Sequence, residues 1–335
     1  MRTKLLLLST FVLLACENIL VNDEIATDQT SIFNLFWEDY NRNYAGFVVR
    51  NIDWDSTRSS ALTSIKGGLS EEEFFELLGS IVVNFEDIHA EIIDTHGRRI
   101  RYSPKNPSSI SMIGPLNDYL ISARKAGEIF TYGNIINEEI GYIQIPTFSS
   151  RFSLNQYEQI DIVIRNLGNI KGLVLDLRNN GGGQSDRQKT VTQRFVKNSF
   201  TYIQGQFRNG CDHNNFDPPI SDDISPGGSI QFTGPTVILA NRASGSSAEV
   251  FVMTLETQEH IMIVGDTTAG GLGLNTWREL PNGWNYRMTL TLTSNGDGIS
   301  YEAQGIPPHE VVFFTKQDSI DRVDPQLDRA IELLL

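Results

Sequence analysis

Three stretches of this 335-residue chain hold residue types that can carry chemistry. The first is residues 175–183, Leu-Asp-Leu-Arg-Asn-Asn-Gly-Gly-Gly, in which an apolar strand pattern runs into three glycines. Glycines at such a turn let the backbone approach a ligand and direct amide groups outward, as an anion site or an oxyanion hole requires. A tight turn between a strand and a helix needs the same residues, whereas the spaced glycines of a dinucleotide-binding fingerprint are missing. This stretch therefore indicates either a plain turn or an amide-lined anion site.

The second stretch is residues 243–249, Ala-Ser-Gly-Ser-Ser-Ala-Glu, between an expected strand and an expected helix. A serine at a helix N-terminus is most often a cap. A reactive hydroxyl would occupy the same place, because the amides and the helix dipole there favour negative charge. Composition alone leaves both interpretations open for Ser244, Ser246 and Ser247.

The third stretch is residues 85–91, Phe-Glu-Asp-Ile-His-Ala-Glu, and its histidine is a candidate base. An imidazole with a pKa near neutrality can exchange a proton with a hydroxyl, although a lone histidine is more often structural. His213 lies in a polar segment and His260 at the end of an expected helix, so neither is an obvious base. The chain contains five histidines: His89, His96, His213, His260 and His309.

An alternation of strands and helices is expected to position the first two stretches. Short β-branched or apolar runs predict strands at residues 142–145, 172–177, 237–240 and 261–264. Helical patterns occur between them at residues 154–167, 185–197 and 247–258. Strands separated by helices imply an α/β fold with parallel strands that are covered on both faces. We assign residues 92–335 to this domain, with a long polar surface loop at residues 207–229.

The third stretch follows a segment with helical periodicity. Apolar residues recur at helical spacing over residues 31–40 and again over residues 74–85. Ser70 and Glu73 fit a capping box, in which the serine accepts from the Glu73 amide and the glutamate reaches back. We therefore predict a small N-terminal helical domain at residues 30–91.

The first residues have the pattern of a lipoprotein signal peptide. A short basic end precedes an apolar run at residues 5–14, which is too short for a helix across a hydrocarbon core of about 30 Å. The run closes with Leu-Leu-Ala-Cys, which resembles a bacterial lipobox. We predict a signal peptide at residues 1–15, a lipid on Cys16 and a polar tether at residues 16–29. The lipid would link the protein to a membrane of the bacterial cell envelope. The alternative is an ordinary secretory signal with a cysteine near its cleavage site.

Composition narrows the classes of partner and cofactor. The chain has 41 acidic and 27 basic residues, a net charge of −14 and 40% hydrophobic content, which describes an acidic globular protein. Negative charge repels phosphate backbones, so no nucleic-acid partner is expected. The chain has no closely spaced pair of His or Cys residues, so we expect no metal, and no organic cofactor is expected. A lipid on Cys16 would leave Cys211 unpaired, so no disulfide is expected.

Four motifs, taken in order, resemble those of the carboxyl-terminal processing (tail-specific) peptidases and their tricorn-core-like relatives. They are Asp-x-Arg-x-Asn-x-Gly-Gly at residues 176–183, the serine-rich turn at 244–249, Gly-Asp-Thr-Thr-Ala-Gly-Gly at 265–271, and Gln-Gly-Ile-Pro-Pro at 304–308. The resemblance covers roughly residues 30–315. It implies an α/β (α+β) fold with a crotonase/ClpP-like ββα core. It also implies a serine-type endopeptidase that hydrolyses peptide or protein substrates through an acyl-serine.

The resemblance assigns a nucleophile and a base. The family pattern Ser-x-x-Glu matches residues 246–249 and makes Ser246 the nucleophile. The position at which the Ser/Lys branch of the family has its lysine, residue 271, is glycine in this chain. The tricorn-like branch instead uses a histidine in an Asp-x-His context, which implies that His89 is the general base.

The resemblance also implies supporting groups. Glu302 is the candidate carboxylate that orients the imidazole of His89, with Asp87 and Glu249 as alternatives, and Glu249 is expected to orient the nucleophile turn instead. The oxyanion hole would use the amides of Gly182 or Gly183 and of Ser247.

Two other functions stay open on the same fold. The chain could be a non-catalytic protein that binds a peptide or an apolar ligand, or an esterase with the same nucleophile. Only about 50 residues separate His89 from the strand at residue 142, too few for the PDZ domain that many members of the family insert. Peptide selection is therefore expected to come from the cleft and the helical domain.

Overall fold

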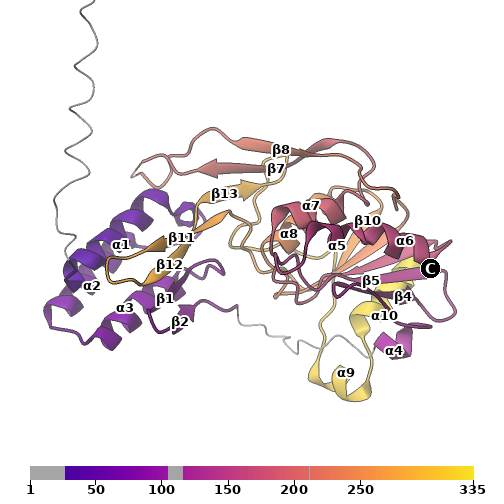
Figure 1. Ribbon diagram of the computed structural model, residues 1–335, viewed down its shortest axis with the longest axis horizontal. Helices are drawn as coiled ribbons and strands as arrows, with labels where there is room; N and C mark the ends of the chain where they lie inside the picture. The colour runs from indigo at the N-terminus through magenta and orange to yellow at the C-terminus, as the bar shows by residue number, and fades with distance from the viewer. Residues whose placement is uncertain (1–26, 105–115, 211) are drawn as a thin grey trace, which may run out of the picture.

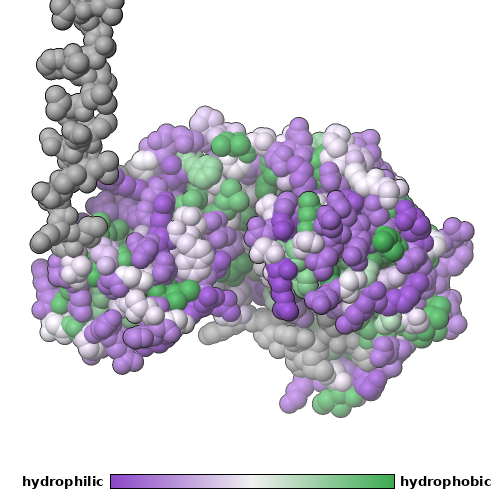
Figure 2. Space-filling view, viewed as in Figure 1, coloured by the Kyte–Doolittle hydropathy of each residue, from purple (hydrophilic) through white to green (hydrophobic). Residues whose placement is uncertain are grey.

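The computed structural model describes residues 27–104, 116–210 and 212–335. The predicted signal peptide, Cys16 and Cys211 lie outside these residues. A helical part with a small sheet lies at one side of the molecule, and a larger part built on the main sheet lies at the other (Figure 1). The surface in this view is mostly hydrophilic, with a hollow between the two parts (Figure 2).

The main sheet has seven strands. Their order is β14 (Glu310–Val311), β10 (Ile261–Gly265), β9 (Thr236–Ala240), β6 (Gly172–Asp176), β5 (Ile140–Gln144), β4 (Phe130–Asn134) and β3 (Arg124–Ala126). The strands from β14 to β5 pair in parallel, whereas β4 and β3 add an antiparallel edge. The four predicted strands are β5, β6, β9 and β10, so the expectation of a parallel α/β core is confirmed.

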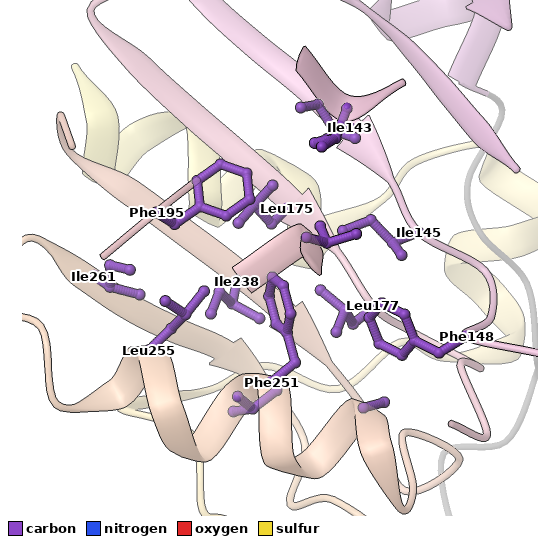
Figure 3. Close-up of a cluster of buried hydrophobic side chains, with 14 of the residues drawn as sticks. Ile143, Ile145, Phe148, Leu175, Leu177, Phe195, Ile238, Phe251, Leu255 and Ile261 are labelled. Atoms are coloured by element: carbon purple, nitrogen blue, oxygen red, sulfur yellow. The ribbon is translucent and has the colours of Figure 1, made fainter. Parts of the chain in front are cut away.

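Helices cover both faces of this sheet because its strands are apolar on both sides. In β6, Leu173 and Leu175 belong to one buried cluster and Val174 to another, as the alternation of side chains along a strand requires. Helix α8 (Ser247–Glu256) lies against the first face with Phe251 and Leu255 directed at the strands (Figure 3). The other helices of this part are α4 (Leu116–Tyr119), α5 (Leu154–Glu158), α6 (Ile160–Leu167), α7 (Ser185–Thr192), α9 (Lys316–Asp321) and α10 (Pro325–Leu334).

The N-terminal part begins with helices, as predicted. They are α1 (Gln29–Asn43), the 3-10 helix η2 (Ala45–Val48), α2 (Trp54–Lys66) and α3 (Glu71–Asn84). The predicted capping box is present at the start of α3. The Ser70 amide donates to Oε2 of Glu73 at 2.8 Å, and the Glu73 amide donates to the Ser70 hydroxyl at 3.2 Å.

These helices share their core with a second sheet from two distant parts of the chain. Its order is β11 (Asn275–Glu279), β12 (Asn285–Thr289), β1 (Glu91–Ile93) and β2 (Arg99–Arg101). Trp284, Tyr286 and Met288 are buried in the same cluster as the aromatic residues of α1 and α3. The boundary placed at residue 91 therefore does not separate two independent cores, because strands from residues 275–289 complete the helical part.

A third sheet contains part of the segment predicted as a loop. Its order is β13 (Thr291–Ser294), β7 (Phe200–Phe207) and β8 (Ile220–Ile224). The prediction of a loop throughout residues 207–229 is wrong for β8, which pairs with β7. All but the last residue of β8 are exposed, so its polar sequence hid the strand.

No helix within residues 27–104, 116–210 and 212–335 has the length and apolar character that a membrane span requires.

Candidate active site

Ser246 lies in a strained turn directly before helix α8. Its φ of 56° and ψ of −125° fall in a region that non-glycine residues rarely adopt, and such strain is often kept at functional sites. The neighbouring serines have structural partners: the hydroxyl of Ser244 donates to the Leu177 carbonyl at 2.8 Å, and that of Ser247 to the Gly183 carbonyl at 2.8 Å. Ser246 is the N-cap of α8 and, unlike the other two serines, lines an open cleft. This difference separates the three serines that composition could not.

The carboxylate of Glu249 holds this turn. It is fully buried and accepts from the amide of Ser246 at 2.9 Å. It also accepts from the Thr268 hydroxyl at 2.7 Å and from the amides of Gly270 and Gly271 at 2.6 and 2.9 Å. Burial raises the pKa of Glu249, and these hydrogen bonds oppose the rise. The interpretation that Glu249 orients the nucleophile turn is consistent with these bonds.

The glycine run packs tightly against the same turn. A Cβ on Gly182, whose φ is +91°, would lie 2.6 Å from the Gly245 carbonyl oxygen and 2.8 Å from Cβ of Ser246. A Cβ on Gly183, whose φ is +148°, would lie 2.2 Å from the Phe148 carbonyl oxygen. Both the backbone conformation and the lack of space therefore require glycine at these two positions.

The structure distinguishes the predicted oxyanion donors. The Gly182 amide donates to Oδ1 of Asn180 at 2.9 Å, so it is already used and is not a free donor. Gly183 forms a parallel bridge with Phe148, flanked by bonds from the Phe148 amide to the Gly182 carbonyl and from the Gln184 amide to the Phe148 carbonyl. In such a bridge the amide of Gly183 points away from Phe148, to the side on which its carbonyl accepts from Ser247. Gly183 and Ser247 therefore stay the candidate donors, whereas Gly182 shapes the turn.

Side-chain and backbone bonds join the glycine run to the serine turn. The amide of Gly245 donates to the Asn180 carbonyl at 2.9 Å. The side-chain amide of Asn241 donates to Oδ1 of Asn179 at 3.0 Å, and its Oδ1 accepts from the Asn179 amide at 3.0 Å. The relative position of the candidate nucleophile and the candidate donors is thus fixed.

The charged residues of the glycine-run motif have a structural role. Arg178 and Asp176 are buried, and Nη2 of the arginine lies 2.6 Å from Oδ2 of the aspartate. Nη1 of Arg178 lies 2.9 Å from Oδ1 of Asp324, the N-cap of α10. This pair therefore attaches the C-terminal helix to the main sheet.

His89 reaches the serine turn through its neighbour Ile88. A Cβ added to Gly245, which directly precedes Ser246, would lie 3.0 Å from Cδ1 of Ile88. A Cβ added to Gly271 would lie 2.4 Å from Cγ1 of Ile88. His89 is 4% exposed, and its Nδ1 is buried without a hydrogen-bond partner among the described residues. Burial, together with the charges of Arg287 and Arg50, lowers the pKa of His89 to about 4 against the opposing charge of Asp87. The imidazole is therefore neutral at pH 7 and able to accept a proton.

A buried charge network holds the segment that carries His89. Oδ1 of Asp87 accepts from the His89 amide at 2.8 Å, and its Oδ2 accepts from the hydroxyls of Tyr44 at 3.0 Å and Thr289 at 2.7 Å. Arg50 lies 4.0 Å from Oδ1 of Asp87 and donates to the Glu86 carbonyl at 2.7 Å. Burial raises the pKa of Asp87, but Arg50, His89 and the hydrogen bonds outweigh it, so the net shift is downward.

Glu302 belongs to this network but does not contact the imidazole. Its Oε1 accepts from Arg50 at 3.1 Å, and its Oε2 accepts from the amides of Leu272 and Gly273 at 2.8 and 3.0 Å. Burial and the charge of Asp87 raise the pKa of Glu302, and Arg50 opposes them. The structure therefore does not have Glu302 orienting His89 directly, because the carboxylate oxygens accept from Arg50 and two backbone amides while Nδ1 of His89 has no partner among the described residues.

The predicted nucleophile and the predicted base line one cleft of about 620 Å³. From the larger part of the molecule it is lined by residues 181–184, 242–243 and 245–246, and from the N-terminal part by His89 and residues 101–104. Two other histidines are engaged elsewhere: Nδ1 of His309 accepts from the Ile263 amide at 2.9 Å, and His213 stacks on Phe47 with ring centroids 3.9 Å apart.

Sequence reasoning missed several residues around the cleft. Arg50 and Tyr44 lie in the helical segment, far from any motif, and no local pattern marks them. Arg101, Trp277 and Arg287 come from short strands that the sequence analysis did not predict. These three residues become neighbours through the pairing register of β11, β12, β1 and β2, which no local sequence pattern reveals.

Comparisons with known proteins agree with this geometry. A family model described as Peptidase family S41 matches residues 139–312, about half of the chain. Over 177 residues the chain is 27% identical to the carboxy-terminal processing protease CtpA of Bacillus subtilis, covering 53% of this chain and 36% of that protein. Over 203 residues it is 28% identical to the tricorn protease of Thermoplasma volcanium, covering 59% of this chain and 18% of that protein.

The chain thus spans about a third of the length of the Bacillus protease and about a fifth of the length of the tricorn protease. A solved structure of a candidate peptidase from Parabacteroides merdae matches over nearly its whole length. Its TM-score is 0.84 at 27% identity, with 92% of this chain and 98% of that chain covered.

Proposed function

Because the chain belongs to peptidase family S41, we propose that it is a serine-type endopeptidase that uses Ser246 as nucleophile and His89 as general base. The observation that carries the proposal is that these two residues line one cleft together with the glycine run, although they come from opposite parts of the molecule. A serine hydroxyl at a helix N-terminus and a neutral histidine supply the nucleophile and the base that acyl transfer needs.

The mechanism follows the usual course of serine hydrolysis. Nε2 of His89 accepts the hydroxyl proton as Oγ of Ser246 attacks the carbonyl carbon of the scissile bond. The imidazolium then donates that proton to the leaving amine nitrogen, which leaves an ester on Ser246. A water molecule, deprotonated by His89, attacks the ester, and the proton returns to Oγ as the acid product leaves.

Two amides are proposed to stabilise the oxyanion. The amide of Ser247 lies in the first turn of α8, where the helix dipole favours negative charge. The amide of Gly183 points to the side of the glycine run on which the Gly183 carbonyl accepts from Ser247. Removing one such donor typically costs about 10² to 10³ in kcat.

Positioning of the base is assigned to the buried network rather than to a carboxylate on the imidazole. Asp87 binds the His89 amide, and Arg50 connects Asp87 to Glu302. Glu302 therefore acts through Arg50 and the amides of Leu272 and Gly273.

The location and the substrate belong to the same proposal. The lipobox pattern at Cys16 supports a lipid-anchored protein of the bacterial cell envelope, and the cleft supports a peptide or protein substrate. Radiolabelled fatty acid should be incorporated into the wild-type chain and not into Cys16→Ala if the anchor is correct.

Covalent labelling tests the nucleophile. An active-site phosphonate should modify the purified mature protein once per chain, and peptide mapping should find the label on Ser246. Ser246→Ala should abolish labelling and peptide cleavage, while Ser244→Ala is the matched control at a serine outside the cleft. Labelling that persists in Ser246→Ala would reject the assignment.

Kinetics test the base. His89→Ala should lower kcat by about 10⁴, the scale reported for triad residues, with an unchanged circular dichroism spectrum. Near-normal turnover would remove His89 from the mechanism.

Saturable peptide binding that survives Ser246→Ala, with no product from the wild type, would instead identify a binding protein. Ester turnover without peptide turnover would identify an esterase.

A further inference from the structure

One row of residues crosses the whole four-stranded sheet beside the candidate active site. Arg287 on β12 is the Cα partner of both Trp277 on β11 and Glu91 on β1, and Glu91 is also the partner of Arg101 on β2. Directly opposed residues point to the same face of a sheet, so the four side chains lie side by side. Trp277, Arg287 and Arg101 line the cleft, whereas Glu91 is 1% exposed beneath them.

The positive charge of this row exceeds its negative charge. Glu91 is paired with two cations, Nη2 of Arg287 at 2.6 Å and Nη1 of Arg99 at 3.2 Å, and Arg101 is a third cation on the same face. The pKa of Arg287 lies below its usual value because of its burial, and Arg99 and Arg101 lower it further against the attraction of Glu91. The one carboxylate therefore does not neutralise the three guanidinium groups.

The opposite wall of the cleft also carries a positive charge. Arg242 lies in the segment that leads to Ser246, and its Nη1 donates to the Thr268 carbonyl at 2.9 Å. No Asp or Glu is among the described residues that line the cleft, although the chain as a whole carries a net charge of −14. An acidic protein thus presents a cationic cleft around its candidate nucleophile.

We propose that the row Trp277–Arg287–Arg101, which we call the arginine row, binds acidic side chains of the peptide substrate, so that the enzyme prefers Asp or Glu near the cleaved bond. This inference rests on the proposed function and names its substrate class. A guanidinium binds a carboxylate through charge-assisted, bidentate hydrogen bonds. Trp277 supplies an apolar wall next to that pair, since the guanidinium of Arg287 lies 5.4 Å from its ring centroid.

The test uses short peptides with both ends blocked that differ only by Asp or Asn, or by Glu or Gln, at single positions around the cleaved bond. Wild type should cleave the acidic member of at least one pair with a kcat/KM about fivefold higher, and the ratio should shrink as ionic strength rises. Arg101→Gln should remove most of the preference, and Arg101→Glu should reverse it. Arg42→Gln is the matched control and should keep the preference, because Arg42 is an exposed arginine on α1 that pairs with Glu38 at 3.6 Å.

A binding measurement makes the test independent of turnover. Fluorescently labelled Asp and Asn peptides should bind the Ser246→Ala variant with the same ratio of affinities, and adding Arg101→Gln should equalise them. Equal kcat/KM and equal affinity for every acidic and neutral pair would overturn the proposal. A rate gain that needs only a free C-terminal carboxyl group, whatever the side chains, would overturn it as well. Failure of Ser246 to accept the phosphonate would count against the proposed function, and the binding ratio would still decide the role of the arginine row.

Discussion

The two halves of the candidate catalytic pair are held in place by different means. Ser246 is fixed by its own neighbourhood: Glu249 lies one helical turn later, and the glycine run packs against the turn with no space for a side chain. His89 is held by Asp87, two residues before it, and by Arg50, which contacts Asp87 from the N-terminal helical part. The nucleophile turn is therefore held within the larger part of the molecule, whereas the position of the base depends on how the two parts of the molecule meet.

This difference has an energetic consequence. Most of the bonds that hold Ser246 involve backbone amides and one carboxylate. The His89 segment depends on a buried cation between two buried acidic groups, Asp87 and Glu302. Removing one member of a buried ion network leaves the others without compensation in a low dielectric. Changes near His89 should therefore cost more than changes of similar size near Ser246.

The largest effect is expected for Arg50→Met. It leaves Asp87 and Glu302 buried without their cation, so the free energy of unfolding should fall by about 3–5 kcal/mol, with a further loss of kcat in the folded fraction. Urea unfolding and peptide kinetics measure the two effects. Arg194→Met, which breaks the 2.7 Å pair with Asp161 in the other part of the molecule, should lose stability without loss of kcat. Equal kinetic losses in both variants would contradict a specific role for Arg50.

A smaller loss is expected for Glu249→Gln. The amide group of glutamine would face at least one pair of the four donors that now share the carboxylate, so stability should fall by about 1–3 kcal/mol. The Ser246 turn should loosen and kcat should fall by about tenfold or more. Glu256→Gln, on the same helix, changes the acceptor of the Tyr301 hydroxyl and should leave kcat unchanged. If both variants behave alike, Glu249 does not hold the nucleophile.

The pH profile tests the base without any substitution. Only neutral His89 can accept the proton of Ser246, and its pKa is lowered to about 4. The value of kcat/KM for an uncharged peptide should therefore stay constant from neutral pH downward and fall to half near pH 4. The contribution of His89 to stability should decrease from about pH 6.5 to about pH 4, because the unfolded chain binds the His89 proton over that range and the folded chain binds it only near pH 4. An acid limb near pH 6.5 would mean that the imidazole is solvated rather than buried.

The smallest effect is expected for Tyr44→Phe. The change removes one hydrogen bond to Asp87, 3.0 Å long, and should cost about 1 kcal/mol and a severalfold loss of kcat. Tyr132→Phe removes a 3.0 Å bond to Asn166 in the larger part and is the matched control. Because Tyr44 binds Asp87 in the His89 segment and Tyr132 lies in the larger part, only Tyr44→Phe should lower kcat.

The sequence predicts the main strands and the serine turn well. Strands β5, β6, β9 and β10 and the capping box of α3 depend on residues that are close in sequence. The Ser246 turn is marked by its own Ser-x-x-Glu pattern, although residues 177–183 and 268–271 help to hold it. The charge network and the arginine row have no such local pattern. Arg50 and Glu302 meet across 252 positions, and Arg287 and Glu91 meet only through pairing of β12 with β1. By residue type and place, either Gly182 or Gly183 fits an oxyanion donor, and only the structure reveals that the Gly182 amide already donates to Asn180.

A structure of the phosphonate adduct tests the central claim most directly, because it places the base, the nucleophile and the oxyanion donors around one phosphorus atom. The account predicts that phosphorus is bonded to Oγ of Ser246. It predicts a phosphoryl oxygen about 2.7–3.1 Å from the amide nitrogens of Gly183 and Ser247, with Nε2 of His89 within hydrogen-bond reach of the adduct. An adduct on another residue, or an imidazole that stays outside that reach, would contradict it.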